Sequence, residues 1–401
     1  MSGRVVWRSR PFGYVWAGES LSMVGDAGYQ IVFVWLVLSI SQSPAVLAAV
    51  LVATSVPRGL LLLLGGAVSD RVSARTVMLS SHVVRGAALV ILTILALTTG
   101  LRVWELTSIG ILFGIADAFF GPASGSILPC LVDEADLPRA NALVGVSEQA
   151  AGFVGPVLAG ALLAATSPWL ALAFNATTFL IAALTILTAP KTEQSNARRP
   201  SITTLLAQMR DGIAYAARNA EVRIVLLLVT AATLSYSGLF AVGLPTLARR
   251  LNGGSLALGV MVSAWGLGQL LGAIGASITG LPRRWGPLII AMTLTEGTCF
   301  AVLGLLPHYL LAAALLALLG IGVAYSTDVA LPTFIQTRTP RPMLGRINSV
   351  IALPRFAAEP VSISAMGAVA PFGVGWSFAL AAVPMLIAGT VLATNPTARH
   401  L

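Results

Sequence analysis

Long apolar stretches alternate with short polar turns along the whole chain. A helix needs about 20 mainly apolar residues to cross a bilayer, and twelve stretches reach that length. We therefore predict twelve membrane-spanning helices, at residues 12–40, 44–68, 76–98, 104–128, 138–165, 168–189, 222–247, 255–280, 286–306, 308–336, 343–370 and 372–394.

One long polar stretch, from Pro190 to Arg223, separates the first six predicted spans from the last six. Residues 192–200 are typical of a linker. Residues 201–219 carry apolar side chains at helical spacing, which favours a helix lying in the membrane interface; for the first half of the stretch a solvated connector is the alternative. The pattern predicts an N-terminal six-helix half, a cytoplasmic linker with an interfacial helix, and a C-terminal six-helix half, at residues 1–189, 190–221 and 222–401.

Composition agrees with a membrane protein that crosses the bilayer many times. Hydrophobic residues make up 57% of the chain and charged residues 10%, whereas soluble domains carry about 25% charged residues. The formal net charge of +9 does not indicate nucleic-acid binding, because excess Lys and Arg in a membrane protein mark cytoplasmic loops. With both termini cytoplasmic, the basic residues left on the outside are Arg102, Arg249 and Arg250.

The two halves resemble each other weakly. The stretch PRANALVGVSEQ, from Pro138, aligns with LGRINSVIALPR, from Leu344, and pairs Arg139 with Arg346. Such a repeat predicts two pseudo-symmetric halves related by an axis along the membrane normal.

A charged turn, GGAVSDRVSAR from Gly65 to Arg75, lies between the second and third predicted spans. Its spacing resembles the signature loop of the major facilitator superfamily, with Val68 and Ser73 in place of the usual Leu and Gly. An ordinary cytoplasmic turn with basic anchors is the alternative. The resemblance implies a gating role for Gly66, Asp70, Arg71 and Arg75.

The fifth predicted span contains Ala151-x-x-x-Gly155-Pro156-x-x-Ala159-Gly160, which resembles the antiporter signature of that superfamily. Pro156 removes a backbone donor and bends the helix, and the small residues permit a close approach to another helix. We expect Gly155 and Pro156 to help seal the transport path, against an eighth span containing Gly266, Gly268 and Gly272. General helix packing is the alternative.

Four further stretches resemble one branch of this superfamily in particular. SMVGDAGYQ, SVPRGLLLLLGG, DAFFGPASGSILPCLV and LPRANAL are similar to the macrolide-efflux and enterobactin-exporter-like branch of drug:proton antiporters. The resemblance implies an all-α membrane protein with about twelve helices, multi-pass in the cell inner (plasma) membrane, working by alternating access as a monomer.

Charged side chains inside the spans are the candidates for proton coupling, because each costs about 2.5–3.5 kcal/mol at a helix centre unless it is paired or used. Counting about 1.5 Å per residue puts Glu19, Arg58, Arg85, Asp117 and Glu148 in one layer near mid-depth, with Asp26 nearer the outside. We therefore expect Glu19 to stay ionised beside an arginine and Asp26 to be the better proton carrier. The proton-coupling candidates are Asp26, Glu19, Asp117 and Glu148, with Arg58 and Arg85 as charge partners; purely structural ion pairs are the alternative for Asp117 and Glu148.

Two acids of the second half receive separate interpretations. Glu359 lies four residues after Arg355, so a same-face ion pair is the simplest account of it. Glu296 has no basic neighbour in its own span; a structural role is favoured for it, and a functional role is the alternative.

Aromatic side chains in the spans predict an apolar cavity that suits amphipathic or cationic drugs better than sugars, which need many hydrogen-bonding partners. Packing in the core or in the lipid-facing belt is the alternative for each of them. The substrate-binding candidates are Tyr29, Phe33, Tyr236, Phe240, Trp265 and Asp328.

No phosphate-binding loop, nucleophile–base arrangement or cluster of metal ligands occurs in the sequence, so we expect no enzyme activity and no cofactor, and transport driven by an ion gradient. We predict a proton-coupled secondary transporter that exports small apolar or amphipathic compounds, including antibiotics. Its partners are the small-molecule substrate, protons and the lipid bilayer, without nucleic acid. The alternatives are a dedicated metabolite or siderophore exporter on the same scaffold, a proton-coupled importer, and a non-transporting sensor or assembly factor.

Overall fold

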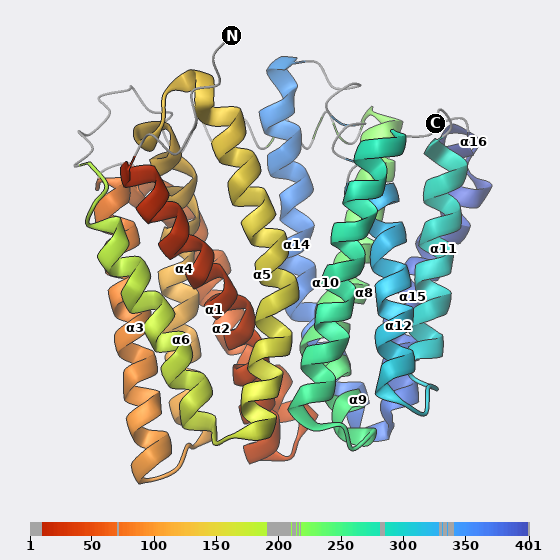
Figure 1. Ribbon diagram of the computed structural model, residues 1–401. Coiled ribbons are helices and arrows are strands. Elements are labelled where there is room, and N and C mark those ends of the chain that lie inside the picture. The colour runs from red at the N-terminus through yellow and green to blue at the C-terminus, as the bar shows by residue number, and fades with distance from the viewer. Residues whose placement is uncertain are drawn as a thin grey trace. The chain divides into compact units, whose positions relative to one another are not determined.

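The structure is a computed structural model, and it describes residues 10–69, 72–190, 210, 214, 216, 218–280, 285–328, 331, 335 and 341–399 (Figure 1). Within helices, the side chains of residues 62–69, 328, 341–346, 348–349, 352–353 and 355–356 are not described. Throughout the described residues the secondary structure is helical, without a strand.

The chain divides into two compact units. The first contains Met1–Asn196 and Gly253–Ser263, and the second contains Ala197–Asn252 and Ala264–Leu401. The division resembles the two halves expected from the sequence, with one exception. Residues Gly253–Ser263, which begin a helix of the second half, belong to the first unit.

Six long helices build the first unit. They are α1 (Arg10–Ser41), α2 (Pro44–Ser69), α3 (Ala74–Thr98), α4 (Val103–Leu131), α5 (Leu137–Ala165) and α6 (Pro168–Ile186), with a short 3-10 segment, η2 (Glu134–Asp136), before α5. In Figure 1 they run alternately in opposite directions. Helix α1 packs against α5 and α6, while α3 packs against α4 and α6.

The second unit holds the remaining helices. They are α8 (Ala220–Gly238), η3 (Leu239–Gly243), α9 (Leu244–Arg250), α10 (Gly254–Thr279), α11 (Trp285–Leu303), α12 (Tyr309–Val323), η4 (Ala324–Asp328), α14 (Arg341–Val369), η5 (Ala370–Phe372), α15 (Val374–Thr394) and α16 (Pro396–Arg399), and α10 begins in the first unit. Helix α8 packs against α14 and α15, and α11 packs against α15.

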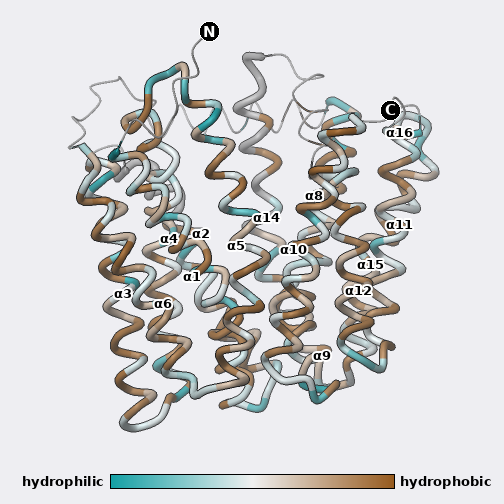
Figure 2. Tube along the Cα trace, in the orientation of Figure 1, coloured by the Kyte–Doolittle hydropathy of each residue, from teal (hydrophilic) through white to brown (hydrophobic). Residues whose placement is uncertain are grey.

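Eleven helical segments among the described residues are long and apolar enough to cross a membrane. They match eleven of the twelve predicted spans, and α14 lies at the remaining one, residues 343–370. Helix α14 is less apolar than the others because it carries Arg346, Arg355, Glu359 and two internal prolines. Figure 2 shows hydrophobic residues along much of the long helices where they are drawn in colour, and hydrophilic residues near many of the helix ends. The prediction of an all-α membrane protein with about twelve helices is confirmed.

Polar side chains and glycine fix several helix ends. Ser73 accepts a hydrogen bond from the Thr76 N–H and begins α3, and Asn219 accepts two from the first turn of α8. Each satisfies N–H groups that have no partner inside the helix. Gly100, with φ of 75°, follows α3, where a residue with a Cβ would be strained.

Small residues in α5 face two neighbouring helices within the first unit. A Cβ at Gly155 would lie 2.7 Å from the Ala27 Cβ of α1, whereas one at Gly160 would lie 2.6 Å from the Ser255 carbonyl oxygen in the first turn of α10. Ser255 Oγ also donates a hydrogen bond to the Gly160 carbonyl over 3.1 Å. The first turns of α10 therefore belong with α5.

The expected partner surface on the eighth span was wrong for two of its three glycines. We expected Gly268 and Gly272 to face the fifth span, but both press against α12, where a Cβ would meet the carbonyl groups of Ala317 and Ile321. The first turn of α10, around Ser255, makes the contact with α5 instead. The small residues occur all along α10, and only the rotation of that helix decides which of them meet which neighbour.

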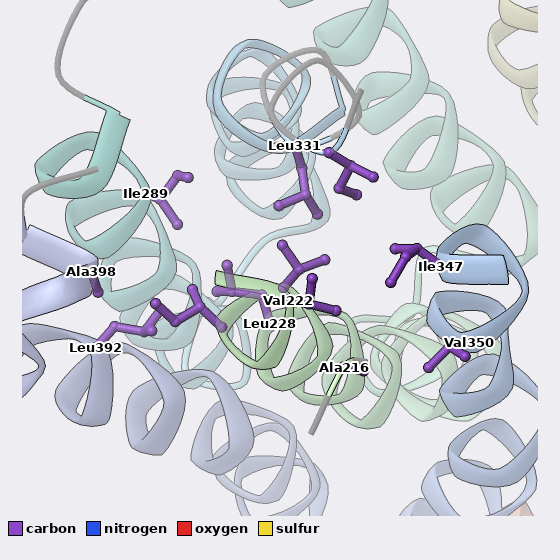
Figure 3. Close-up of a cluster of buried hydrophobic side chains, with 12 residues drawn as sticks. Ala216, Val222, Leu228, Ile289, Leu331, Ile347, Val350, Leu392 and Ala398 are labelled. Carbon is purple, nitrogen blue, oxygen red and sulfur yellow. The ribbon is translucent and has the colours of Figure 1, made fainter. Parts of the chain in front are cut away.

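A cluster of buried aliphatic residues ties one end of the second unit together (Figure 3). Val222 and Leu228 of α8 meet Ile289 of α11, Ile347 of α14 and Leu392 of α15. The cluster holds these four helices at a common level. The interfacial helix expected at residues 201–219 lies largely outside the described residues.

Candidate functional site

Four charged residues of the first unit, Asp26, Arg58, Arg85 and Asp117, meet across four helices, and we refer to them as the charged cluster. Arg85 Nη1 lies 3.4 Å from both carboxylate oxygens of Asp26, and Arg85 Nη2 lies 3.9 Å from Asp117 Oδ1. Arg58 Nη2 lies 2.8 Å from the other oxygen of Asp117. The four groups therefore alternate in charge, from Asp26 through Arg85 and Asp117 to Arg58, and the cluster is nearly neutral.

Arg85 is the buried centre of the charged cluster, with 2% of its side chain exposed. Its guanidinium donates two hydrogen bonds to Ser81 Oγ, one turn earlier on α3, over 3.1 and 2.9 Å. Its planar group also lies over the ring of Phe120, 4.6 Å from the centroid, in a cation–π contact. Asp26 and Asp117 keep 38% and 34% of their side chains exposed, so a fixed, buried cation faces two accessible carboxylates.

Among the described residues, Glu19 pairs with a histidine and not with an arginine. Its Oε1 lies 2.7 Å from His82 Nε2, and the histidine side chain is completely buried. We expected the arginines beside Glu19 and farther from Asp26, and this was wrong for Arg85. Counting residues along each helix gives the depth of the backbone only. The length of an arginine side chain and the crossing of α1 over α3 bring Arg85 to Asp26 and His82 to Glu19.

Glu148 lies on α5 with an exposed side chain and forms no ion pair with the described residues. The neighbouring Ser147 is buried and accepts a hydrogen bond from Ser20 Oγ of α1 over 2.8 Å. The layer of five charges expected near mid-depth is therefore not one cluster: Glu19 and Glu148 lie apart from the ion pairs of the arginines.

The charged turn between α2 and α3 is anchored to α6. Arg75 Nη2 donates a hydrogen bond to the carbonyl oxygen of Leu187, over 2.7 Å, at the end of α6. A cation is favourable there because the last carbonyl groups of a helix lack partners and carry partial negative charge. Gly66 falls in the last turns of α2, and Asp70 and Arg71 lie outside the described residues.

Two of the expected substrate-binding aromatics are packed inside the first unit. Tyr29 and Phe33 are 8% and 5% exposed. The Tyr29 ring stacks on Phe113, with centroids 4.2 Å apart, and lies 5.5 Å from Phe33. Neither residue is among the described residues that line the cavity of the second unit, and both pack against other aromatic rings.

A cavity of about 650 Å³ lies within the second unit. We call it the aromatic cavity, because Tyr236, Phe240 and Trp265 form one of its walls. The Trp265 ring lies 5.4 Å from each of the other two, and Tyr236 stacks on Phe240 at 5.9 Å. The other lining residues are Leu228, Val229, Ala232, Thr233, Ser237, Gln269, Thr293, Glu296, Val323, Thr327, Leu331, Glu359 and Met385.

Glu296 is a cavity residue for which the sequence favoured a structural role, and it was not among the predicted site residues. It is 2% exposed, lines the aromatic cavity, and accepts a hydrogen bond from the Tyr236 hydroxyl over 2.7 Å. An acid in an apolar span was the available signal, but its partner lies on another helix, 60 residues away. Asp328 ends the segment η4, and its side chain is not described.

Two π-helical segments border the aromatic cavity. The segment η3 contains the lining residue Phe240, and η4 contains the lining residue Thr327. Ser362 of α14 supports the first, because its hydroxyl accepts a hydrogen bond from Gly238 N–H and donates one to the Leu234 carbonyl. Single π-turns are frequent at functional sites because they redirect side chains.

A bundle of apolar helices that holds ion pairs and a lined cavity within its spans is the architecture of a membrane transporter. The model of the transmembrane secretion effector family matches residues 3–398. The chain therefore belongs to this family, a branch of the major facilitator superfamily, and is a multi-pass transporter of the cell inner membrane, not an enzyme.

The chain aligns with three curated relatives over most of its length. The multidrug efflux pump Tap of Mycolicibacterium fortuitum is 25% identical over 92% of this chain and 92% of its own length. Macrolide efflux protein A of Streptococcus pyogenes is 22% identical over 89% and 88%. The enterobactin exporter EntS of Citrobacter koseri is 28% identical over 78% and 73%. The resemblance to the macrolide-efflux and enterobactin-exporter-like branch is confirmed.

Solved structures show the same fold. A POT family transporter crystallised with a thioalcohol-conjugated peptide has a TM-score of 0.74 at 12% identity, covering 96% of this chain and 95% of that one. At this identity the likeness concerns the fold alone.

Proposed function

We propose that this chain is a proton-coupled exporter of small apolar or amphipathic compounds, including antibiotics, that works by alternating access of its two six-helix halves. One observation carries the proton coupling: the buried Arg85 faces two partly exposed carboxylates, Asp26 and Asp117, inside the spans. Ionisable groups placed at such cost inside a membrane protein are used for ion relays or substrate binding.

Asp26 is the proton carrier in this proposal. Arg85 is held by Ser81 and Phe120 whether or not Asp26 is ionised. Protonation of Asp26 removes its attraction to Arg85, which leaves the guanidinium to Asp117, while Arg58 also competes for Asp117. Loading one proton therefore shifts a chain of ion pairs across α1 to α4, and such a shift between two arrangements is a means of coupling proton binding to helix movement.

The other predicted residues take supporting roles. Glu19 is held by His82, so it is an alternative proton site that the arginines do not control, and Glu148 is an exposed acid on α5. The turn residues Gly66, Asp70, Arg71 and Arg75 act at the cytoplasmic gate, with both termini on the cytoplasmic side. The substrate set comprises Tyr236, Phe240, Trp265 and Asp328 in the second unit.

Export, and not import, is supported by the relatives, which are named a multidrug efflux pump, a macrolide efflux protein and an enterobactin exporter. A dedicated siderophore exporter is the second candidate, because the enterobactin exporter is 28% identical, above the 25% of the multidrug pump.

Everted membrane vesicles test the direction and the coupling. With an acidic lumen, vesicles containing the protein should take up a macrolide or a fluorescent amphipathic drug against its gradient, and a protonophore should abolish this uptake. A panel of unrelated drugs and a siderophore, offered as competitors, separates a broad exporter from a dedicated one. Drug uptake into right-side-out vesicles driven by an acidic outside would instead establish an importer and contradict the proposal.

A further inference from the structure

We propose that the aromatic cavity of the second unit is a binding site for an amphipathic organic cation, with the Glu296 carboxylate as its charged anchor. The inference rests on the proposed function, in that the ligand is the transported compound. It goes further by assigning the charge of that compound and the residue that selects it.

The charges that line the aromatic cavity are of one sign. Glu296 and Glu359 are acids, and no Lys, Arg or His occurs among the described lining residues. Among the described lining residues, an anionic ligand would therefore meet acids and no cation. A cationic ligand would face a buried carboxylate, and burying a charge is tolerated when an opposite charge faces it.

The aromatic wall is suited to the same ligand charge. Tyr236, Phe240 and Trp265 lie within 5.9 Å of one another, centroid to centroid, and all three border the cavity. A cation over an aromatic face is attracted by the negative charge of that face, most strongly for Trp. The wall and Glu296 therefore favour one class of ligand, with an apolar body and a positive charge.

The size of the cavity and its remaining lining agree with a drug-sized compound. Its 650 Å³ lies within the range of about 300–1,000 Å³ in which proteins hold such ligands. Thr233, Gln269 and Thr293 are among the few uncharged polar side chains in the lining, too few for the many hydroxyl groups of a sugar. The aliphatic cluster of Figure 3 shares Leu228 and Leu331 with the lining and bounds the cavity there.

Tyr236 is a positioning residue in this site. Its hydroxyl donates a hydrogen bond to Glu296 Oε2 over 2.7 Å, and its ring is held edge-on by Phe300 at 4.9 Å. A hydrogen bond to a carboxylate is stronger than one between neutral groups, so it fixes the rotamer of Glu296. The same residue thus presents its ring to the ligand and orients the anchoring charge.

Binding to the purified protein in lipid nanodiscs tests the proposal with two probes of similar shape: tetraphenylphosphonium, a permanent cation, and triphenylphosphine oxide, which is uncharged. Glu296→Gln keeps the shape of the side chain. Because the cation then loses a buried charge partner, the variant should weaken tetraphenylphosphonium binding by about tenfold or more, and that of the oxide by less than about threefold. Tyr236→Phe should weaken cation binding by a few-fold, since it keeps the ring and removes the hydrogen bond.

Glu221→Gln is the matched control. It removes a carboxylate from the same helix as Tyr236, 15 residues earlier, which is about 22 Å along the axis, and should leave the binding of both probes unchanged. Phe240→Leu is a second test, in case the Glu296 variant does not fold. It removes an aromatic face without changing a charge, and it should again weaken the binding of the cation more than that of the oxide. Equal losses for both probes, unchanged binding in Glu296→Gln, or no cation binding by the wild type would each overturn the assignment.

The vesicle assay keeps this inference separate from the proposed function. If Glu296→Gln loses tetraphenylphosphonium binding but still accumulates a neutral compound uphill, both stand. If tetraphenylphosphonium binding depends on Glu296 but the wild type accumulates no compound, the export proposal fails and the assignment of the cation site stands. If export is intact and cation binding does not depend on Glu296, the site assignment fails alone.

Discussion

Single side chains set the electrostatics of the first unit. Arg85 is held by a serine one turn away and by an aromatic ring, so its position does not depend on the acids that it faces. The acids are the accessible members, and Asp26 is the more exposed of the two, at 38%. Protonation therefore changes the carboxylates while the cation stays in place.

We expect Asp26→Asn to abolish uphill export while substrate binding is kept within about threefold, because a neutral amide resembles the protonated acid and removes one charge partner of Arg85. The measurements are drug accumulation in everted vesicles and proton release on adding substrate to detergent-solubilised protein. Wild type should release protons, and Asp26→Asn should not.

Asp133→Asn is a suitable control for this change, because Asp133 is an exposed acid beyond the end of α4. It should leave export and proton release at wild-type levels. Should Asp26→Asn still pump uphill and release protons, the proton carrier is another acid, and Asp117, Glu148 and Asp328 are the next to test.

Helix α5 shows how a small-residue face serves two neighbours. Gly155 meets α1 at Ala27 and Val24, while Gly160 meets the first turn of α10. The pattern Ala151-x-x-x-Gly155-Pro156-x-x-Ala159-Gly160 therefore combines a contact inside the six-helix bundle with a contact to a helix that continues into the second unit. Substitutions along it should differ in effect according to the neighbour that they displace.

Gly155→Leu should destabilise the first unit by about 1–3 kcal/mol or more, as overpacking does, because its Cβ alone would come within 2.7 Å of the Ala27 Cβ and the Val24 carbonyl oxygen. With α1 displaced, the charged cluster shifts and the protein leaks protons. The unfolding midpoint in detergent and the proton permeability of proteoliposomes measure these two effects.

Gly152→Leu, nearly one turn earlier on α5, is the matched control, since a Cβ there would meet nothing within 4 Å. It should stay within about 0.5 kcal/mol of the wild type, as substitutions away from packed sites do. Equal stability and equal coupling in the two variants would mean that the close approach of α5 to α1 is dispensable.

For the whole molecule, the transport cycle requires movement that a single arrangement of helices does not provide. In the proposed function the turn from Gly65 to Arg75 controls that movement, and Arg75 donates a hydrogen bond to the carbonyl oxygen of Leu187, at the end of α6 and three residues before the predicted linker begins at Pro190. This contact ties the turn to the end of the six-helix bundle. Loss of the turn's charges should therefore alter rates more than affinities.

Asp70→Asn should slow substrate exchange by about tenfold, a change of 1.4 kcal/mol in the barrier, and should leave the substrate Kd nearly unchanged, because no residue of the turn is among the described residues that line the aromatic cavity. Counterflow rates in proteoliposomes and equilibrium binding in nanodiscs give the two values. A large loss of affinity at a normal exchange rate would place Asp70 at the substrate site.

Much of the fold could be predicted from the sequence. The helix positions follow from local hydrophobicity, and the starts of α3 and α8 follow from Ser73 and Asn219, because spans and caps are decided by residues close together in the chain. The family was likewise recognisable from the turn at Gly66 and the motif at Gly155. The candidate site was predictable only as a set of residue types, namely acids, arginines and aromatics within apolar spans.

The partners of those residues were decided by the tertiary structure. Arg85 meets Asp26, His82 meets Glu19, Tyr236 meets Glu296, and Gly268 meets α12. Each pair joins different helices, so it depends on how the helices are tilted and rotated about their axes, which packing against neighbours sets and the hydrophobic length does not. The sequence by itself determined which segments cross the membrane and which charges they carry, because both are local; which charges meet, and where a cavity remains, was decided when the helices packed.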